Sequence, residues 1–223
     1  MLMDKKIIAI IPALNEYAKL GEVVKQVLQH VDEIVVVDDG SKKPLKDLLP
    51  SLSNLFMLRH RINLGKGAAL KTGVEFAKIR QADFVVFIDA DGQHNPEEIP
   101  SFIAPLADNE ADIVFGVRKF HKKMPFVARC GNYFLTKTLQ LFFNISISDT
   151  QSGFRSFRID VYPKIVWNSP RYAVETEMIV NVGKNNTRFI EVPIQTIYHD
   201  NYRGTTVVDG IRIFLNMIIW KFL

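Results

Sequence analysis

The chain has few cysteines and no long apolar run. Cys130 is the single cysteine among 223 residues, which excludes an intrachain disulfide and a cysteine-built zinc site and fits a reducing compartment. No stretch reaches the ~20 apolar residues of a membrane-spanning helix. The nearest approach, residues 211–223, contains Arg212, Asn216 and Lys221. We therefore expect that the chain as given does not cross a membrane.

The charge balance and the glycine pattern exclude further classes. Lys plus Arg number 28 and Asp plus Glu 24, and this mild excess of +4 gives no reason to expect nucleic acid as a partner. With 48% hydrophobic and 23% charged residues, the chain is neither disordered nor a coiled coil. Residues 12–16 contain no glycine, so the fingerprint of a dinucleotide-binding turn is absent.

Short β-branched runs alternate with helical patterns over roughly the first half of the chain. The runs are apolar almost throughout, as in strands buried on both faces of a parallel sheet. They are Ile7–Ile11, Glu33–Val37, Phe84–Ile88 and Asp112–Phe115, with a weaker one at Phe56–Arg59. The helical patterns are Lys19–His30, Gly67–Arg80 and Pro96–Asn109. This order predicts an α/β fold with right-handed crossovers.

The second half of the chain is basic and aromatic. Residues 118–148 include six Lys or Arg and no Asp or Glu. Helices are predicted at 125–144, 174–184 and 207–222, and a strand at 188–196. With no linker rich in Pro, Gly or Ser, we expect one compact domain over residues 1–206 and an amphipathic helix over 207–223.

Carboxylates follow three of the predicted strands. They are Glu16 after the first, Asp38 and Asp39 after the second, and Asp89 and Asp91 after the Phe84–Ile88 run. Ligands bind beyond the carboxyl ends of strands in open α/β sheets. At any single strand end, capping of the following helix explains the carboxylate equally well. Five carboxylates together, however, would repel one another unless a cation were present.

Asp89 and Asp91 are the sharpest pair. Two carboxylates separated by one residue at a strand end can reach one ion, and Gln93 could add a neutral oxygen. Such all-oxygen ligation suits Mg²⁺ or Mn²⁺, which also bind phosphate oxygens. Elsewhere in the chain, residues 63–67 (Asn-Leu-Gly-Lys-Gly) precede a helix without the spacing or the hydroxyl of a P-loop. We expect a glycine turn there, with Lys66 in solvent; the less favoured alternative places Lys66 near a phosphate.

Taken together, five segments resemble the family 2 glycosyltransferases of the GT-A fold. They are 12–16 (Pro-Ala-Leu-Asn-Glu), 36–41 (Val-Val-Asp-Asp-Gly-Ser), 65–69 (Gly-Lys-Gly-Ala-Ala), 89–93 (Asp-Ala-Asp-Gly-Gln) and 149–155 (Asp-Thr-Gln-Ser-Gly-Phe-Arg). Within the family the chain is most similar to the dolichyl- or polyprenyl-phosphate mannosyl- and glucosyltransferases. The resemblance runs from about Ile7 to about Val208 and implies a Rossmann-like, mostly parallel central sheet.

The resemblance also implies roles for individual residues. The nucleotide sugar would be bound by Pro12, Leu14, Glu16, Val37, Asp39, Asp89, Ala90, Asp91 and Arg203. The metal, Mg²⁺ or Mn²⁺, would be held by Asp89, Asp91 and Gln93. The acceptor phosphate would be bound by Arg118, Arg129 and Asn132, and the catalytic residues would be Asp91, Arg118 and Arg129.

The function implied is transfer of a hexose, mannose or glucose, from a GDP- or UDP-sugar to a polyprenyl phosphate, with inversion. An anionic phosphate acceptor needs cationic neighbours and no strong base. A sugar hydroxyl would need a carboxylate base, for which Glu175, Glu177 and Asp149 are candidates. The alternative for these residues is a structural role alone: the two glutamates would only occupy the first turn of a helix, and Asp149 would only pair with Arg155. Two other functions stay open: a family 2 enzyme acting on a sugar hydroxyl in polysaccharide or glycolipid synthesis, and a non-catalytic sugar-nucleotide-binding protein.

The C-terminal helix suggests where the enzyme works. At helical spacing, one apolar stripe comprises Ile211, Phe214, Leu215, Ile218, Ile219 and Phe222. We expect this helix to rest on the cytoplasmic, inner face of a membrane, where the basic stretch would meet anionic head groups. The alternative is a final helix packed on the sheet.

Overall fold

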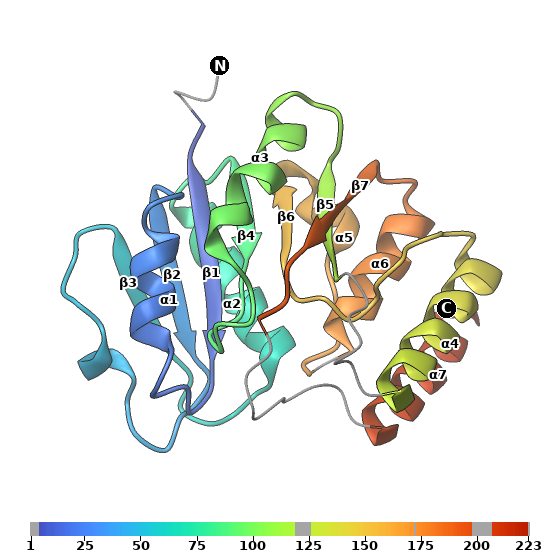
Figure 1. Cartoon of the computed structure of the whole chain (residues 1–223), viewed down its shortest axis with the longest axis horizontal. Coiled ribbons are helices and arrows are strands. Elements are labelled where there is room, and N and C mark those ends of the chain that lie inside the picture. The colour runs from blue at the N-terminus through green and yellow to red at the C-terminus, as the bar shows by residue number, and fades with distance from the viewer. Residues whose placement is uncertain (1–4, 119–125, 172, 198–206, 223) are drawn as a thin grey trace.

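One mixed β-sheet organises the protein (Figure 1). The structure, a computed structural model, describes residues 5–118, 126–171, 173–197 and 207–222, without the side chains of 126–130, 132 and 207–209. Within these residues, seven strands pair in the order β3-β2-β1-β4-β6-β5-β7. All neighbours are parallel except β6, which is antiparallel to both β4 and β5. This is the mostly parallel, Rossmann-like sheet that the sequence predicts.

The elements follow the expected alternation. The strands are β1 (Ile7–Ala13), β2 (Glu33–Asp38), β3 (Leu55–Arg59), β4 (Phe84–Phe87), β5 (Ile113–Arg118), β6 (Arg155–Arg158) and β7 (Phe189–Ile194). The α-helices are α1 (Leu20–Val27), α2 (Lys66–Ile79), α3 (Ile99–Ala107), α4 (Phe126–Phe143), α5 (Tyr162–Ile165), α6 (Val174–Lys184) and α7 (Val207–Phe222). Short 3₁₀ turns are η1 (Lys46–Leu48), η2 (Pro96–Glu98) and η3 (Ile159–Val161).

Alternate residues of the central strands enter two separate cores. In β1, Ile8 and Ile10 face the core covered by α2 and α6, whereas Ala9 and Ile11 face the core covered by α1 and α3. Because successive side chains of a strand point to opposite faces, a strand covered on both sides is apolar at nearly every position. This explains why these strands are readable in the sequence.

Among the described strands, β6 is the one that the sequence analysis misses; the short helix α5 is missed as well. Its four residues include two arginines and one phenylalanine, which is not the composition of a buried strand. Arg155 is nevertheless fully buried, because its guanidinium donates hydrogen bonds to the backbone carbonyls of Thr150, Ser152 and Glu175. The folded chain thus supplies hydrogen-bond acceptors for the buried guanidinium of Arg155, whereas the sequence pattern alone predicts an exposed arginine.

Two boundaries differ from the prediction. Strand β5 continues through Gly116 and Val117 to Arg118, so Arg118 is the last residue of the strand and does not follow it. The helix predicted from Pro96 divides into η2 and α3. The first residues of η2 are capped as expected, with the Asn95 side chain accepting a hydrogen bond from the amide of Glu97.

Helices α4 and α7 lie side by side, beyond the β7 edge of the sheet (Figure 1). Ile213 and Met217 of α7 are buried, and Trp220 packs against the same core. Among the described residues, α7 packs mainly on α4 and α6, and its buried residues Ile213 and Met217 belong to the core cluster that lies against the sheet. Within the described residues, no helix combines the length and apolar character needed to cross a bilayer.

Candidate active site

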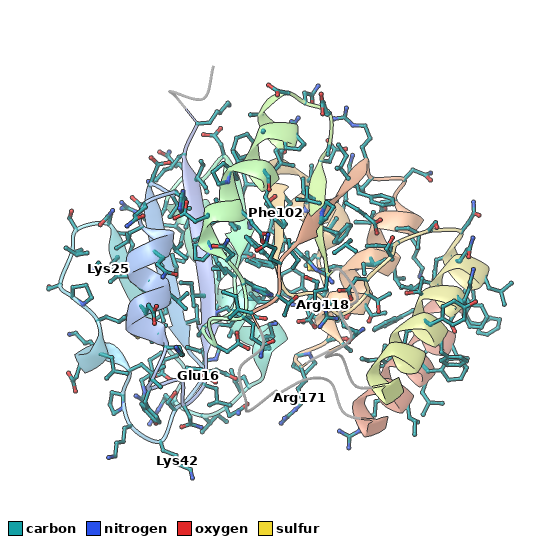
Figure 2. All side chains as sticks on the ribbon, in the orientation of Figure 1. Glu16, Lys25, Lys42, Phe102, Arg118 and Arg171 are labelled. Atoms are coloured by element: carbon teal, nitrogen blue, oxygen red, sulfur yellow. The ribbon has the colours of Figure 1, made fainter. Side chains whose placement is uncertain are left out.

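The predicted carboxylates Glu16, Asp39, Asp89 and Asp91 follow the carboxyl ends of β1, β2 and β4, at one edge of the sheet. We call this the acidic edge and define it as residues 12–16, 38–41 and 89–94. In Figure 2, the labelled Glu16 and Arg171 lie toward the lower side of the molecule, and Arg118 lies nearer its middle. Parallel strands that end together bring these sequence-distant segments to one place, as the crossover topology requires.

Lys66 joins two carboxylates at the centre of the acidic edge. Its Nζ lies 2.7 Å from Oδ1 of Asp89 and 2.9 Å from Oε1 of Glu175. Asp89 comes from the end of β4, Lys66 from the first turn of α2 and Glu175 from the first turn of α6. The expectation that Lys66 lies in solvent is wrong, since its side chain is only 18% exposed.

The charges of this triad stabilise one another. Burial alone would lower the pKa of Lys66, but the carboxylates of Asp89 and Glu175 more than offset it and raise that pKa. Burial likewise favours the neutral form of Asp89, and the positive charge of Lys66 outweighs it, so the pKa of Asp89 is lowered. Lys66 is therefore cationic and Asp89 anionic at neutral pH.

Asp91 has a different environment. Its Oδ1 accepts a hydrogen bond of 3.0 Å from the backbone amide of Gln93. Burial and the negative charge of Asp89 raise its pKa. A divalent cation between the two carboxylates would relieve this repulsion. The donor chemistry fits Mg²⁺ or Mn²⁺, which take one or two carboxylates and complete their shell with water and phosphate oxygens. No group of three or more His, Cys, Asp or Glu that could cage a metal occurs among the described residues.

The carboxylates at the end of β2 already have partners within the chain. Asp38 accepts hydrogen bonds from the guanidinium of Arg59, at 2.9 Å, and from the amide of Ser41. Asp39 is bound by the imidazole of His60, at 2.7 Å, and by the amides of residues 64 and 65. The expected repulsion among five carboxylates is thus largely relieved by the protein itself, and only part of it is left for an added cation.

Arg118 forms a buried, two-pronged ion pair with Asp149. The Nε and Nη2 atoms of Arg118 lie 2.6 and 2.9 Å from Oδ2 and Oδ1 of Asp149, whose side chain is fully buried. Burial would raise the pKa of Asp149, but the hydrogen bonds and charge of Arg118 lower it. The alternative that Asp149 pairs with Arg155 is wrong, because Arg155 donates to backbone carbonyls instead.

The loop before α6 covers the start of α2. The carboxylate of Glu177 accepts hydrogen bonds from the amides of Asn168 and Ser169, and the carbonyl of Pro170 accepts one from Ala68. Gly65 adopts φ +103°, and a Cβ there would collide with the Pro170 carbonyl. The glycines around Lys66 therefore allow close packing of this loop, in agreement with a glycine turn.

His94 is a further residue of the site that the sequence analysis leaves without a role. Its Nδ1 accepts a hydrogen bond of 3.3 Å from the amide of Asp89, and its ring stacks on Phe154. Burial lowers the pKa of His94, so the ring is neutral. It holds the backbone of the carboxylate pair in place. A lone histidine five residues after an aspartate carries no signal for such a role.

The remaining predicted binding residues divide into two groups. Pro12, Leu14 and Glu16 are half-buried at the acidic edge, whereas Val37 and Ala90 are buried in the two cores. The donor-binding role of these residues stays a prediction. Three other predicted site side chains lie outside the described residues: Arg129, Asn132 and Arg203.

The fold and the acidic edge define a class of protein. Residues 8–166 match the family described as Glycosyl transferase family 2. The match covers most of the chain, which therefore belongs to this family and is a glycosyltransferase with the GT-A fold.

Particular relatives narrow the comparison. The chain is 32% identical to the UDP-N-acetylglucosamine–dolichyl-phosphate N-acetylglucosaminyltransferase of Methanococcus voltae, over 99% of this chain and 98% of the relative. It is 27% identical to a dolichyl-phosphate β-glucosyltransferase of Trichomonas vaginalis, over 83% of this chain and 64% of the relative. The crystal structure of glucosyl-3-phosphoglycerate synthase from Mycobacterium tuberculosis with UDP superposes with a TM-score of 0.76 at 19% identity, covering 100% of this chain and 82% of that one. This last likeness shows the fold.

Proposed function

We propose that this glycosyltransferase moves a hexose from a nucleoside diphosphate sugar to a polyprenyl phosphate at a membrane surface. One observation carries the choice of acceptor: the three carboxylates that the sequence indicates as candidate bases all have partners among the described residues. Glu175 pairs with Lys66, Glu177 accepts two backbone amides, and Asp149 pairs with Arg118. A lipid phosphate is already an anion and needs no such base.

The acidic edge supplies the donor half of the reaction. Asp89 and Asp91 would hold Mg²⁺ or Mn²⁺, with Gln93 as a further oxygen ligand. The bound ion would act as a Lewis acid and neutralise the charge that develops on the leaving diphosphate. Structures of the mycobacterial synthase contain Mg²⁺ or Mn²⁺ together with UDP, which supports this choice of ions. The Methanococcus voltae relative is named for a UDP-sugar, so UDP-hexoses are the first donors to test and GDP-hexoses the second.

Arginines supply the acceptor half. Arg118 stands at the end of β5, and the stretch after it is basic. Its guanidinium would orient the acceptor phosphate by charge-assisted hydrogen bonds. The predicted partners Arg129 and Asn132 follow in α4. Both dolichyl-phosphate transferases among the relatives have a lipid phosphate in their names, which supports the same class of acceptor.

The α4–α7 helix pair would keep the enzyme at the membrane. Two stripes divide α7: Ile213, Met217 and Trp220 face the protein, while Ile211, Leu215, Ile219 and Phe222 are turned outward, from 52% to 84% exposed. Helix α4 adds Tyr133, Phe134 and Leu141 to the exposed apolar surface. Lys137, Arg212 and Lys221 are exposed on the same two helices, as anionic head groups of the inner leaflet would favour.

A donor panel with a short polyprenyl phosphate tests the proposal. Purified chain with Mn²⁺ is incubated with each radiolabelled UDP- and GDP-hexose, and label is measured in the organic phase. We expect one donor to give an organic-extractable, acid-labile product. Chelation with EDTA should abolish it, and added Mg²⁺ or Mn²⁺ should restore it.

Two other outcomes would contradict the proposal. Label recovered only in water-soluble glycosides would indicate a sugar-hydroxyl acceptor. Tight binding of nucleotide sugar without transfer to any acceptor would indicate a non-catalytic sugar-nucleotide-binding protein.

A further inference from the structure

We infer that Glu175 is a positioning residue, which holds Lys66 against Asp89 and so presents Asp89 to the metal-bound diphosphate of the donor. This inference rests on the proposed function, and it assigns a role to a glutamate that lies outside the predicted metal and nucleotide ligands. Glu175, Lys66 and Asp89 come from three different elements, yet two ion pairs of 2.9 and 2.7 Å connect them.

The contacts of Glu175 point to Lys66. Its side chain is 7% exposed, and Oε1 bonds the ammonium of Lys66. Its other oxygen, Oε2, is buried and accepts no hydrogen bond within the described part of the chain. A buried carboxylate with few partners is costly to a fold. Lys66 is the cation that bonds the Glu175 carboxylate directly, and the buried Arg155, whose guanidinium donates to the Glu175 carbonyl, adds a second positive charge nearby.

The packing around Asp89 leaves little freedom to the triad. A Cβ added to Gly153 would lie 2.5 Å from Oδ2 of Asp89 and 2.8 Å from Nζ of Lys66. The amide of Asp89 is fixed by His94 on the other side. With Oδ1 committed to Lys66, Asp89 has Oδ2 for a metal ion or its bound water. Such outer partners set the orientation of a ligand and the charge around it.

The sign of the effect follows from the charges. Replacing Glu175 with glutamine removes a negative charge near the ion and leaves the charge of Lys66 compensated by Asp89 alone. Both changes disfavour a divalent cation at Asp89 and Asp91. We expect Glu175→Gln to weaken binding of Mn²⁺ and UDP together by about tenfold, the lower end of what loss of an outer partner costs.

The experiment measures binding in the full chain, without turnover. Free Mn²⁺ is followed by electron paramagnetic resonance and nucleoside diphosphate by calorimetry, in the wild type, Glu175→Gln, Lys66→Met and the double variant. If Glu175 acts through Lys66, Glu175→Gln should have no further effect on Mn²⁺ affinity once Lys66 is methionine. The double variant also removes both buried charges, which protects the measurement against a single variant that fails to fold.

Two glutamates serve as controls. Glu177→Gln is equally buried on the same helix but bonds backbone amides, so it should lower Tm while Mn²⁺ affinity stays within about twofold, the range expected for a site outside the network. Glu75→Gln, exposed on α2, should change neither. If Glu175→Gln lowers the Tm but leaves the Mn²⁺ affinity unchanged, Glu175 has a merely structural role and the inference is overturned.

Other results would overturn it in distinguishable ways. Additive losses in the double variant would show that Glu175 and Lys66 act independently. A wild-type chain that binds neither UDP nor GDP in the presence of Mn²⁺ would contradict the proposed function itself, and this inference with it. Normal wild-type binding with an unaffected Glu175→Gln would contradict this inference alone.

Discussion

The acidic edge and the α4–α7 helix pair place polar and apolar side chains in opposite ways. At the acidic edge, charged groups lie inside the protein: Asp38 and Asp39 are buried and are bound by side chains and amides of the same chain. On the helix pair, large apolar side chains such as Leu141 and Phe222 are about four-fifths exposed. Soluble surfaces rarely gather apolar side chains in this way without a partner.

The contrast indicates what each region has to do. Buried, mutually bonded charges keep a fixed geometry, which is what a site must have to stabilise charge developing in a transition state. Exposed apolar stripes contribute little to the core and are available to a lipid surface. The two regions can therefore be perturbed separately, and a substitution in one should leave the other intact.

The largest expected effect is that of replacing Asp91, the second carboxylate after β4. Asp91→Asn removes a charge from the proposed metal and diphosphate site, and we expect transfer to fall on the order of 10³-fold or more. Far-UV circular dichroism should be unchanged, because burial and Asp89 already disfavour the charge of Asp91 in the fold. Asp108→Asn, on an exposed residue, is the control. Full activity in Asp91→Asn would refute the metal assignment.

The Arg118–Asp149 pair should show a stability effect and a binding effect that separate. Arg118→Met leaves Asp149 buried without this partner and should cost about 3–5 kcal/mol in the free energy of unfolding. Adding Asp149→Asn should recover most of that loss. In the double variant the acceptor KM should stay raised, while calorimetry shows donor affinity close to wild type. Collapse of donor affinity would move Arg118 to the donor site.

Gly153→Ala should strain the acidic edge without removing any of its charged groups. The new Cβ would press on Asp89 and Lys66, at a cost of about 1–3 kcal/mol in stability, and donor binding should weaken in parallel. Gly210→Ala in α7 meets no atom within 4 Å and should instead stabilise by about 0.5–1 kcal/mol, as helix propensity requires. The free energies of unfolding of both variants can be measured by chemical denaturation. If both variants change in stability by the same amount, the acidic edge is not tightly packed.

Membrane binding should depend on the outward stripe of α7. Leu215→Ser with Ile219→Ser should reduce flotation with anionic liposomes by about tenfold, since apolar burial contributes ~25 cal/mol per Å², and leave Tm almost unchanged. Met217→Ser, on the buried stripe, should lower Tm instead. Equal flotation of the wild type and the outward double variant would remove this surface from the mechanism.

The smallest effect concerns acid stability. Because Arg118 lowers the pKa of Asp149 in the folded state, the pair stabilises the fold above the unfolded pKa of ~3.9. That stability is lost as pH falls through the lower folded pKa. The Arg118→Met/Asp149→Asn variant should therefore show a flatter dependence of unfolding free energy on pH below about 4. If the unfolding free energy of the variant depends on pH below about 4 as it does in the wild type, other carboxylates dominate the acid stability.

The placement of the carboxylates at one edge of the sheet can be predicted from the sequence, because its signals are local. Strands buried on both faces are apolar at each position, and the residues just after them fall at one edge by topology alone. The Asp89–Asp91 pair needs no more than this. The sequence does not show which residues of α7 turn inward, because the burial of Ile213 and Met217 depends on where α4 and α6 lie.

The sequence by itself determined the α/β alternation, the family resemblance and the position of the carboxylates. The tertiary structure decided which cation meets which carboxylate: Lys66 with Asp89 and Glu175, and Arg118 with Asp149. It also decided that a strand could carry the buried charge of Arg155. The physical reason is that ion pairs and buried polar groups are satisfied by atoms distant in the chain, so their partners become defined only when the elements pack.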